Sequence, residues 1–338
     1  MASIDVIIPV YRPDEKMNRL LDALEMQTVK PERIILVHTG EVLKGEPDYR
    51  ADVAVKCDGT VADAVARLEK KLNKGLDSAF YEEKRALRIL CMLPKDKFDH
   101  GGSRNLGAAL SRSEVMVFMT QDAVPADEHL LEQLLAPFAD EQVGMTYARQ
   151  LPTEDCGVIE RYTRAFNYPP KSREKSASDL KKLGIKTFFA SNVCACYRRE
   201  MFEMLGGFVD KTIFNEDMIY ARKLIEREGK IVYAANALVY HAHNYSGMEQ
   251  LRRNFDLGVS HAEYKEVFSG LSTESEGVRL VKQTCGYLCK IGKPWMIIKL
   301  VWQSGCKYIG YFLGKRYEKL PAAIVKSLSM NKEYWNKM

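Results

Sequence analysis

The sequence predicts an α/β fold with a mostly parallel central sheet, followed by a helical extension at the C-terminus. Two observations support this prediction. Short apolar segments of strand length alternate with segments whose apolar residues recur at helical spacing, and this alternation favours a parallel sheet covered on both faces. The chain has 338 residues, 46% of them hydrophobic, which is enough for one large α/β domain with an appendage.

The first third of the chain supplies most of the predicted strands. Residues 4–11 (IDVIIPVY) predict a buried strand that ends at a turn, and residues 14–27 predict the helix that follows it. The apolar residues that recur at helical spacing in this helix are Met17, Leu20, Leu21 and Leu24. Further apolar segments predict strands at 33–39, 51–57 and 86–93.

The next strand ends on polar residues. A predicted helix at 101–111 (GGSRNLGAALS) leads into the apolar strand 115–119, and Gln121 and Asp122 follow that strand directly. A parallel sheet presents its ligands at the carboxyl ends of its strands, so both side chains are candidates for a binding site. Asp122 also suits a plain turn before the next predicted helix, at 127–138, and spacing alone does not separate the two roles.

Charge is unevenly distributed along the chain. From Glu276 to Met338 there are twelve Lys or Arg residues against three acidic ones, so the basic character belongs to the tail. No stretch reaches the roughly 18 apolar residues of a transmembrane helix, and the N-terminus lacks the features of a signal peptide. We therefore expect a cytoplasmic protein. The eight cysteines are scattered without C-x-x-C spacing, and we expect reduced, mostly buried thiols.

Five segments occur in an order that resembles a known family. They are DVIIPVYRP near the N-terminus, FDHGGSRNLGAAL at 98–110, MTQDAVP at 119–125, GGFVDKTIFNEDMIYARKL at 206–224 and LVYHAHNYS at 238–246. Together they resemble family 2 inverting glycosyltransferases over about residues 3–265, and FDHGGSRN with TQDA is similar to the bacterial rhamnosyltransferase subgroup. The resemblance implies a GT-A type fold, a Rossmann-like domain that we expect over residues 1–265.

The family resemblance also implies a divalent cation. Most members carry Asp-x-Asp at the position of Gln121-Asp122-Ala123, so this chain keeps only one carboxylate of that loop. A cation would neutralise the charge that builds on the departing diphosphate. The resemblance places Asp122 and His241 at the metal, with His243 as a less favoured substitute, and Mg²⁺ or Mn²⁺ as the ion. Ordinary surface histidines are the alternative interpretation.

The resemblance assigns catalysis to an acidic pair. In this family the Glu-Asp pair supplies the base that removes the proton from the acceptor hydroxyl, and we assign the base to Asp217 with Glu216 as the alternative. Both acids lie at the start of a predicted amphipathic helix. They would therefore also suit a helix cap, which interacts favourably with the helix dipole.

Donor binding is expected along the first strand ends. Pro9 and Tyr11 match the family motif at the start of the sheet, and Glu41 is a match for the acid that meets the ribose or base. Gln121 and Asp122 complete the donor side. Arg104 is expected near the base or diphosphate, although an ion pair with Asp99 is an alternative role for it. Asp99 itself resembles a subgroup residue. These candidates are Pro9, Tyr11, Glu41, Asp99, Arg104, Gln121 and Asp122.

Residues 266–338 form the predicted basic, amphipathic helical tail. Apolar residues at near-helical spacing alternate with lysines and an arginine there, which suits the surface of an anionic membrane. The alternative is a helix packed on the catalytic domain or on a second copy, with the lysines in solvent. Nothing in the chain resembles a nucleic-acid-binding module. The apolar residues are Trp295, Ile298, Trp302 and Ile309, and the basic ones are Lys299, Lys307, Lys315 and Arg316.

The rhamnosyltransferase resemblance implies transfer of L-rhamnose from dTDP-rhamnose to a growing cell-surface polysaccharide or lipid-linked glycan. The expected place of action is the inner face of the cell membrane, where the tail would attach peripherally. One alternative is transfer of another nucleotide-activated sugar. A different class is a sugar-nucleotide binding subunit without catalysis, which the missing second carboxylate in the loop would suit.

Overall fold

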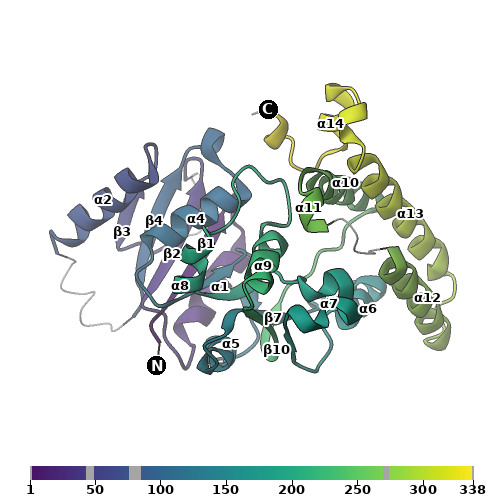
Figure 1. Ribbon diagram of the computed structural model, residues 1–338, viewed down its shortest axis with the longest axis horizontal. Coiled ribbons are helices and arrows are strands. Elements are labelled where there is room, and N and C mark those ends of the chain that lie inside the picture. The colour runs from purple at the N-terminus through teal and green to yellow at the C-terminus, as the bar shows by residue number, and fades with distance from the viewer. Residues whose placement is uncertain (1, 43–48, 76–84, 269–273, 337–338) are drawn as a thin grey trace.

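A computed structural model describes residues 2–42, 49–75, 85–268 and 274–336. Within these residues, ten strands form one sheet in the order β3-β4-β2-β1-β5-β9-β7-β10-β6, with β8 paired to β10 (Figure 1). The strands are β1 Ile4–Val10, β2 Arg33–Thr39, β3 Val53–Lys56, β4 Leu87–Leu93, β5 Val115–Met119, β6 Val124–Pro125, β7 Val143–Leu151, β8 Arg173–Lys175, β9 Cys194–Arg198 and β10 Lys230–Tyr240.

The N-terminal half of the sheet is parallel, as the sequence predicts. β3, β4, β2, β1 and β5 all run in one direction, and β7 and β10 are also parallel to each other. The short strands β6 and β8 are antiparallel to β10. β9 lies between β5 and β7 and runs antiparallel to both, which the sequence did not indicate. The start of β9 therefore lies beside the ends of β5 and β7, at the edge where a parallel sheet presents ligands.

Two layers of apolar side chains cover the sheet. Successive residues of a strand point to opposite faces, so Ile7 and Phe118 belong to one layer while Val6 and Val117 belong to the other. Helix α1 (Glu15–Glu25) covers the second layer with Met17, Leu20, Leu21 and Leu24, all fully buried. This helix starts one residue later than predicted because Asp14 is its N-cap and accepts a hydrogen bond from the backbone N–H of Lys16.

The remaining helices have bounds that differ in places from the sequence prediction. The helix expected at 127–138 is α5 (Leu130–Leu135) followed by a 3₁₀ turn, because Pro137 lacks the N–H that an α-helix would need. The other helices before the C-terminal extension are α2 Val61–Leu72, α4 His100–Leu110, α6 Val158–Asn167, α7 Leu180–Leu183, α8 Arg199–Met204, α9 Glu216–Glu226, α10 Gly247–Glu263 and α11 Lys265–Phe268.

The C-terminal extension is helical, as predicted, and it packs on the domain before it. It consists of α12 Glu274–Lys290, α13 Met296–Gly314 and α14 Ala322–Leu328, at the end of the molecule opposite β3 (Figure 1). Helix α13 lies against α10 at very short range: a Cβ atom on Gly310 would stand 2.1 Å from the carbonyl oxygen of Leu251. Among the described helices, none combines the length and the apolarity that crossing a membrane requires.

One expectation about the cysteines is wrong. Cys57 and Cys91 form a disulfide, whereas the sequence predicted reduced thiols throughout. The reason lies in the sheet: Cys91 is in β4, Cys57 directly follows the neighbouring strand β3, and the pairing of these two strands brings the sulfur atoms together. Cys156, Cys194, Cys196 and Cys306 are buried free thiols, as expected, while Cys289 is exposed.

Candidate active site

The carboxyl ends of the strands open into a large cavity. It has a volume of about 880 Å³ and begins at Tyr11 and Thr39, which follow or end the parallel strands β1 and β2. It then passes Thr120 and His241, at the ends of β5 and β10, and reaches helices α6, α10 and α13. The cavity therefore occupies the edge of the sheet at which the sequence placed Gln121 and Asp122.

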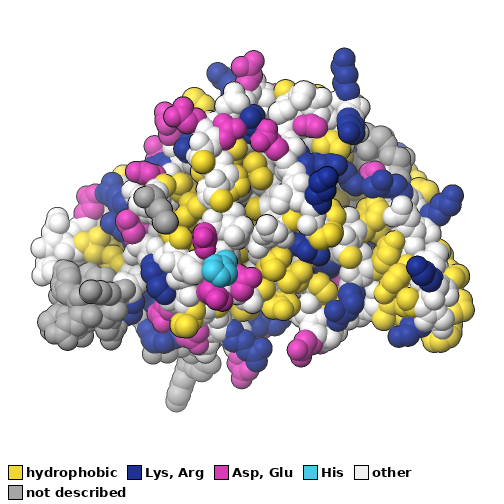
Figure 2. All heavy atoms as spheres, turned by 90° about the horizontal axis from the view of Figure 1, so that it is seen from below, with side chains coloured by type: hydrophobic (Ala, Val, Ile, Leu, Met, Phe, Trp, Pro, Cys, Tyr) yellow, Lys and Arg dark blue, Asp and Glu magenta, His cyan; other side chains and the backbone are white. Residues whose placement is uncertain are grey.

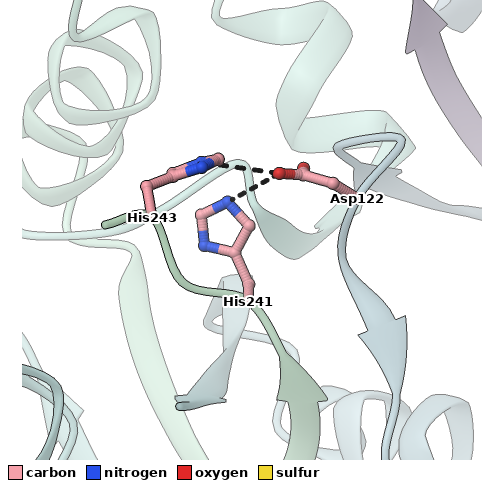
Figure 3. A group of neighbouring side chains, drawn as sticks. All are labelled: Asp122, His241 and His243. Atoms are coloured by element: carbon pink, nitrogen blue, oxygen red, sulfur yellow. Dashed lines mark ion pairs between the residues drawn. The ribbon is translucent and has the colours of Figure 1, made fainter. Parts of the chain in front are cut away.

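Asp122, His241 and His243 lie close together at this cavity (Figure 3). Both histidines line the cavity, and Asp122 lies two residues after the lining residue Thr120. The Nε2 atom of His241 lies 3.5 Å from Oδ2 of Asp122, and Nε2 of His243 lies 3.4 Å from the same oxygen. Their candidate ligand atoms all lie within 4.8 Å of one another. Burial lowers the pKa of His241 to about 3, which outweighs the opposing charge of Asp122 and keeps the ring neutral at physiological pH. A neutral imidazole is the form that binds metals.

Gln150, in β7, contacts the Nδ1 side of the His241 ring. Its side-chain N–H groups donate to the hydroxyls of Tyr168 (2.7 Å) and Ser191 (3.0 Å), so its carbonyl oxygen faces Nδ1 of His241 at 3.1 Å. An amide oxygen accepts hydrogen bonds and cannot donate them, so this contact favours a proton on Nδ1. Nη1 of Arg164, which can only donate, lies 3.4 Å from the same Nδ1 and favours the other tautomer. With the proton on Nδ1, the lone pair of Nε2 is directed at the space beside Asp122.

Gln121 connects two loops at this edge of the sheet. Its Oε1 accepts a hydrogen bond from the backbone N–H of Tyr11 at 2.8 Å, and its Nε2 donates to the Tyr11 carbonyl at 3.0 Å. The side chain thus joins the loop after β5 to the loop after β1. The ring of Tyr11 is 39% exposed at the mouth of the cavity, and the ammonium group of Lys95 lies 5.8 Å from its centre.

Glu216 and Asp217 occupy the first turn of α9. Oδ2 of Asp217 accepts the backbone N–H of Asn192 at 3.0 Å, and Oδ1 accepts that of Met218 at 2.7 Å. Burial and the neighbouring Glu216 raise the pKa of Asp217 to about 7. The N-cap position itself belongs to Asn215, which adopts a left-handed conformation with φ 67°. Asp217 therefore has a pKa suited to proton transfer near neutral pH.

Glu216 is paired with a cation. Nη1 of Arg104 lies 3.2 Å from its Oε1, and the side-chain amide of Asn192 donates to the same oxygen at 3.0 Å. Burial alone would raise the pKa of Glu216, but Arg104 and then His100 and Asn192 lower it overall. The two acids differ accordingly: Glu216 is stabilised as a carboxylate, while Asp217 titrates near neutrality.

Arg104 pairs with Glu216 and not with Asp99, the partner that the sequence left as an alternative. Asp99 is the N-cap of α4 and accepts the backbone N–H of Gly102 at 2.7 Å. Helix α4 starts there and places Arg104 one turn later, where its Nη1 also donates to the carbonyl of His100 at 2.9 Å. The guanidinium group is buried beside the acidic pair, with 9% of its side chain exposed.

The donor-binding candidates of the first strands lie around a second opening. Tyr11 and Thr39 line both the main cavity and an adjoining one of about 870 Å³, which Glu41, Lys56 and Lys95 also line. Glu41 is exposed in this opening. Pro9 is a partly buried residue of β1, in register with Val37 of β2, and supports the strand that carries Tyr11.

A short segment before β9 joins the acidic pair to the histidine cluster. The backbone N–H of Thr120 donates to the carbonyl of Val193 at 3.1 Å, while Asn192 contacts Asp217 and Glu216. The hydroxyl of Tyr197 donates to the side-chain oxygen of Asn192 at 2.6 Å and fixes its orientation. The loop after β5 and the start of α9 therefore belong to one continuous site.

Comparisons with known proteins identify the family. A model of glycosyl transferase family 2 matches residues 79–206. The chain is 36% identical over 337 residues to the O-antigen chain rhamnosyltransferase RfbN of Salmonella typhimurium, covering 98% of this chain and 96% of the relative. It is 34% identical over 341 residues to the O-antigen chain rhamnosyltransferase WbaN of Salmonella anatum, covering 99% and 96%. The chain belongs to glycosyltransferase family 2.

The fold of this glycosyltransferase is the predicted GT-A type. It aligns with a mannosyltransferase from Pyrobaculum calidifontis, solved in complex with GDP-Man and Mn²⁺, with a TM-score of 0.50 and 15% identity. The alignment covers 99% of this chain and 85% of that one. The mixed sheet, parallel in its N-terminal half, agrees with this fold class.

The glycosyltransferase has a donor set that fits a divalent cation. Asp122 offers a carboxylate oxygen, and His241 and His243 offer imidazole nitrogens. Mn²⁺ accepts both kinds of ligand, whereas Mg²⁺ favours oxygen. The sequence ranked His243 below His241, but the structure places the two rings at nearly equal distances from Asp122.

The far side of the cavity carries two arginines that the sequence did not single out: Arg164 of α6 pairs with Glu160 at 2.8 Å, and Arg253 of α10 lies over the ring of Phe214. Lys307 of α13, expected in the basic tail, lines the same wall. Asn331, after α14, completes this wall, so the C-terminal extension contributes directly to the cavity of the glycosyltransferase. Gln150 and Asn192 were missed as well, although each interrupts an apolar segment with an amide at the edge of the sheet.

Proposed function

We propose that this glycosyltransferase transfers L-rhamnose from dTDP-rhamnose to a hydroxyl group of a growing cell-surface polysaccharide. The observation that supports this proposal is the similarity, over nearly the whole chain, to two proteins named O-antigen chain rhamnosyltransferases. The matched length spans the segments that carry the acidic pair, the histidine cluster and the C-terminal helices. The proposed acceptor is a glycan, either free or linked to a lipid.

Catalysis by direct displacement is the mechanism that the site favours, with inversion at the anomeric carbon. Asp217 takes the proton from the acceptor hydroxyl as its oxygen bonds to the anomeric carbon of the donor sugar. The bond between that carbon and the diphosphate oxygen breaks, and the electron pair leaves with the nucleoside diphosphate. The pKa of Asp217, raised to about 7 by burial and Glu216, supports this role.

Glu216 has a supporting part in this proposal. It is held as a carboxylate by Arg104 and Asn192, and its charge raises the pKa of the neighbouring base. Asn192 contacts both acids and therefore sets their relative orientation. We assign proton removal to Asp217 and positioning to Glu216 and Asn192.

Asp122, His241 and His243 would hold the divalent cation. A cation bound there would supply positive charge next to the departing diphosphate. Gln150 would keep His241 in the tautomer that presents Nε2 to the metal, and Gln121 would fix Tyr11 beside the nucleotide. On the donor side, Tyr11 and Glu41 line the opening that we assign to the nucleoside.

Peripheral attachment to the inner face of the cell membrane is part of the proposal. Apolar side chains gather at the end of the molecule that α12 and α13 form, on the right of Figure 2. Basic residues of α12, α13 and the turns beside them border this surface, a combination that suits an anionic bilayer. The apolar residues of this surface and their exposed fractions are Val278 68%, Trp295 66%, Ile298 78%, Val301 58%, Trp302 62%, Tyr308 61% and Ile309 49%.

A panel of nucleotide-sugars tests the proposed donor. The purified protein is incubated with each donor, a glycan acceptor and Mn²⁺, and the release of free nucleoside diphosphate is measured. We expect the fastest acceptor-dependent release from dTDP-rhamnose, and proton NMR of the product should show the inverted anomer. Faster turnover of another nucleotide-sugar would assign a different donor, and a product with the donor's anomeric configuration would exclude direct displacement.

A further inference from the structure

A second cavity, of about 520 Å³, adjoins the active site on the side of α6, β8 and α12. Two residues, Asn167 and Phe189, line both cavities, so the two are neighbours. Among the described residues that line it, five are basic and none is acidic, and we call it the basic cavity. The basic residues are Lys171, Arg173, Lys175, Lys186 and Arg279, and its aromatic walls come from Tyr147, Phe166, Phe189 and Tyr233.

Lys175 is a buried cation in the wall of this cavity. Only 2% of the residue is exposed, and its ammonium group donates to the carbonyl of Phe189 and the hydroxyl of Tyr147. Within the described part of the chain no carboxylate forms an ion pair with it. An isolated charge is costly to bury, and burial lowers the pKa of Lys175 to about 7. Lys175 therefore loses much of its positive charge near neutral pH, and an anion bound beside it would stabilise the charged form.

The four other basic residues of the basic cavity form ion pairs with only one carboxylate among the described residues. Lys186 and Arg279 both pair with the single carboxylate of Glu276, and both lie over the ring of Phe166, at 5.2 and 5.0 Å from its centre. Lys171 and Arg173 form no ion pair with any described residue. Clustered cations repel one another unless an anion lies between them. Five basic groups with one carboxylate leave room for an anion of more than one charge.

The acidic residues near β8 are engaged elsewhere. Glu174 points to the opposite side of the strand and pairs with Lys230 at 3.1 Å. Asp179 accepts the backbone N–H of Ser176 at 3.0 Å and so caps the turn before α7. Neither side chain lines the basic cavity. The positive charge of the cavity is thus not balanced from the neighbouring chain.

We propose that the basic cavity binds a phosphate or diphosphate group carried by the acceptor. This inference rests on the proposed transferase function, because it assigns the group to the acceptor. The cavity adjoins the main cavity through α6 and Phe189, away from the loops after β1 and β2 that we assign to the donor. Arginine binds phosphate oxygens in pairs, and a multiply charged group matches several cations better than a single carboxylate does.

The position of α12 adds a reason to expect such an acceptor. Arg279 lines the basic cavity, while the preceding residue, Val278, belongs to the exposed apolar surface of α12 and α13. A phosphate at the surface of a bilayer would therefore lie close to the cavity when that apolar surface meets the lipid. The same chemistry would also hold a phosphate within a water-soluble glycan, so the two sources need separate tests.

Binding of inorganic pyrophosphate tests the site directly. Isothermal titration calorimetry is run on the full chain in EDTA, with dTDP present to fill the donor side. The cavity variant is Arg173→Ala with Arg279→Ala, both at exposed positions, and the matched control is Lys181→Ala with Lys182→Ala, exposed cations of α7 outside the cavity. We expect affinity to fall about 10-fold or more in the cavity variant alone. Equal pyrophosphate affinity in all three proteins would overturn the proposal.

Kinetics separate the two sources of phosphate. Three acceptors carry the same glycan: one without phosphate, one with a water-soluble diphosphate, and one with a lipid diphosphate in neutral vesicles. We expect the cavity variant to raise KM about 10-fold for both diphosphates and to leave the unphosphorylated acceptor unchanged. An effect limited to the vesicle-bound acceptor would mean that these cations bind lipid, not a site-bound phosphate, and would overturn the proposal.

The two proposals fail in different ways. Pyrophosphate binding requires no donor turnover, so it would remain if another nucleotide-sugar proved to be the substrate. Conversely, the protein could transfer rhamnose while the cavity variant binds pyrophosphate as tightly as the parent. That result would leave the transferase assignment intact and reject the basic cavity as a phosphate site. Lys175→Met is a further variant, and its melting temperature must be compared with that of the parent because the residue is buried.

Discussion

The backbone N–H of Asn192 donates a hydrogen bond of 3.0 Å to Oδ2 of Asp217. Because Oδ1 of the same carboxylate accepts the N–H of Met218, both oxygens are oriented by main-chain groups. The carboxylate keeps free lone pairs for a proton while its direction is fixed. Asn192 therefore orients the proposed base through its backbone N–H, and its side chain takes no part in this hydrogen bond.

Asp217→Asn should lower kcat by about 10² to 10⁴, the usual contribution of a general base. The amide has the same shape but cannot take the acceptor's proton. Donor affinity, measured by calorimetry, should change little because the substitution removes no group assigned to the donor. A small loss of stability is expected, since the new NH₂ group would face a backbone N–H.

Glu216→Gln is the companion variant. Its loss of charge should lower the pKa of Asp217 and leave Arg104 without its partner, so a moderate fall in kcat with some loss of stability is expected. If Glu216→Gln abolishes turnover while Asp217→Asn remains active, the base is Glu216. Full activity in both variants would rule out the acidic pair.

The pH dependence of the reaction follows from the same residue. A base with a pKa of about 7 must be deprotonated to act, so kcat/KM should rise with pH through neutrality. Stability should change in the opposite direction. Asp217 binds its proton more tightly in the folded state than in the unfolded chain, so its contribution to the free energy of unfolding is lost as pH rises from about 4 to about 7. Asp217→Asn should flatten both profiles, as measured by initial rates and by urea unfolding.

The ligand atoms of Asp122, His241 and His243 predict which divalent ion the protein prefers. Two imidazoles and one carboxylate favour Mn²⁺ over Mg²⁺, and His243→Asp should shift the preference toward Mg²⁺. Electron paramagnetic resonance reports free Mn²⁺ and so measures binding and competition by Mg²⁺ without any turnover. His129→Ala, at an exposed histidine on the edge of α5, is the control. Unchanged Mn²⁺ affinity in Asp122→Asn and His243→Ala would exclude this site, and full activity in excess chelator would exclude a metal role.

Membrane attachment is best tested on the surface of α13. Deleting residues 276–338 would strip α10 of its packing partner, so loss of binding would be ambiguous. Changing Trp295, Ile298 and Ile309 to Ser removes exposed apolar groups, and flotation with anionic vesicles should fall sharply. Met26→Ser with Val61→Ser, exposed at other sites, is the control. Equal flotation of all three proteins would assign the apolar surface to another role.

The family resemblance predicted part of the site, whereas position alone left Asp122 as a turn residue and Asp217 as a helix cap. Asp122, His241 and Asp217 stand next to recognisable strand or helix boundaries, and the structure brings Asp122 and His241 together. Gln150 and Asn192 each interrupt an apolar segment with an amide, but their roles depend on partners elsewhere in the chain, which that local signal does not identify.

Three features of the structure were not predicted from the sequence, and all three have the same cause. The antiparallel direction of β9, the Arg104–Glu216 pair and the Cys57–Cys91 disulfide all arise from the way distant segments pack. Periodicity reports which side of an element is buried, and it does not report the neighbour that buries it. The helical extension was predicted as basic and amphipathic, whereas its share in the wall of the active site became visible only from the packing of α13 on α10.

The central place of β9 has a consequence for biosynthesis. The ribosome delivers β5 and β7 before β9, yet these two strands are joined to each other only through β9. β5 otherwise pairs with β1, and β7 with β10. Until residues 194–198 emerge, the nascent chain carries an open strand edge on β5 and another on β7, and open edges are prone to intermolecular pairing. Chaperone binding during translation should therefore be most needed between the synthesis of β7 and that of β9.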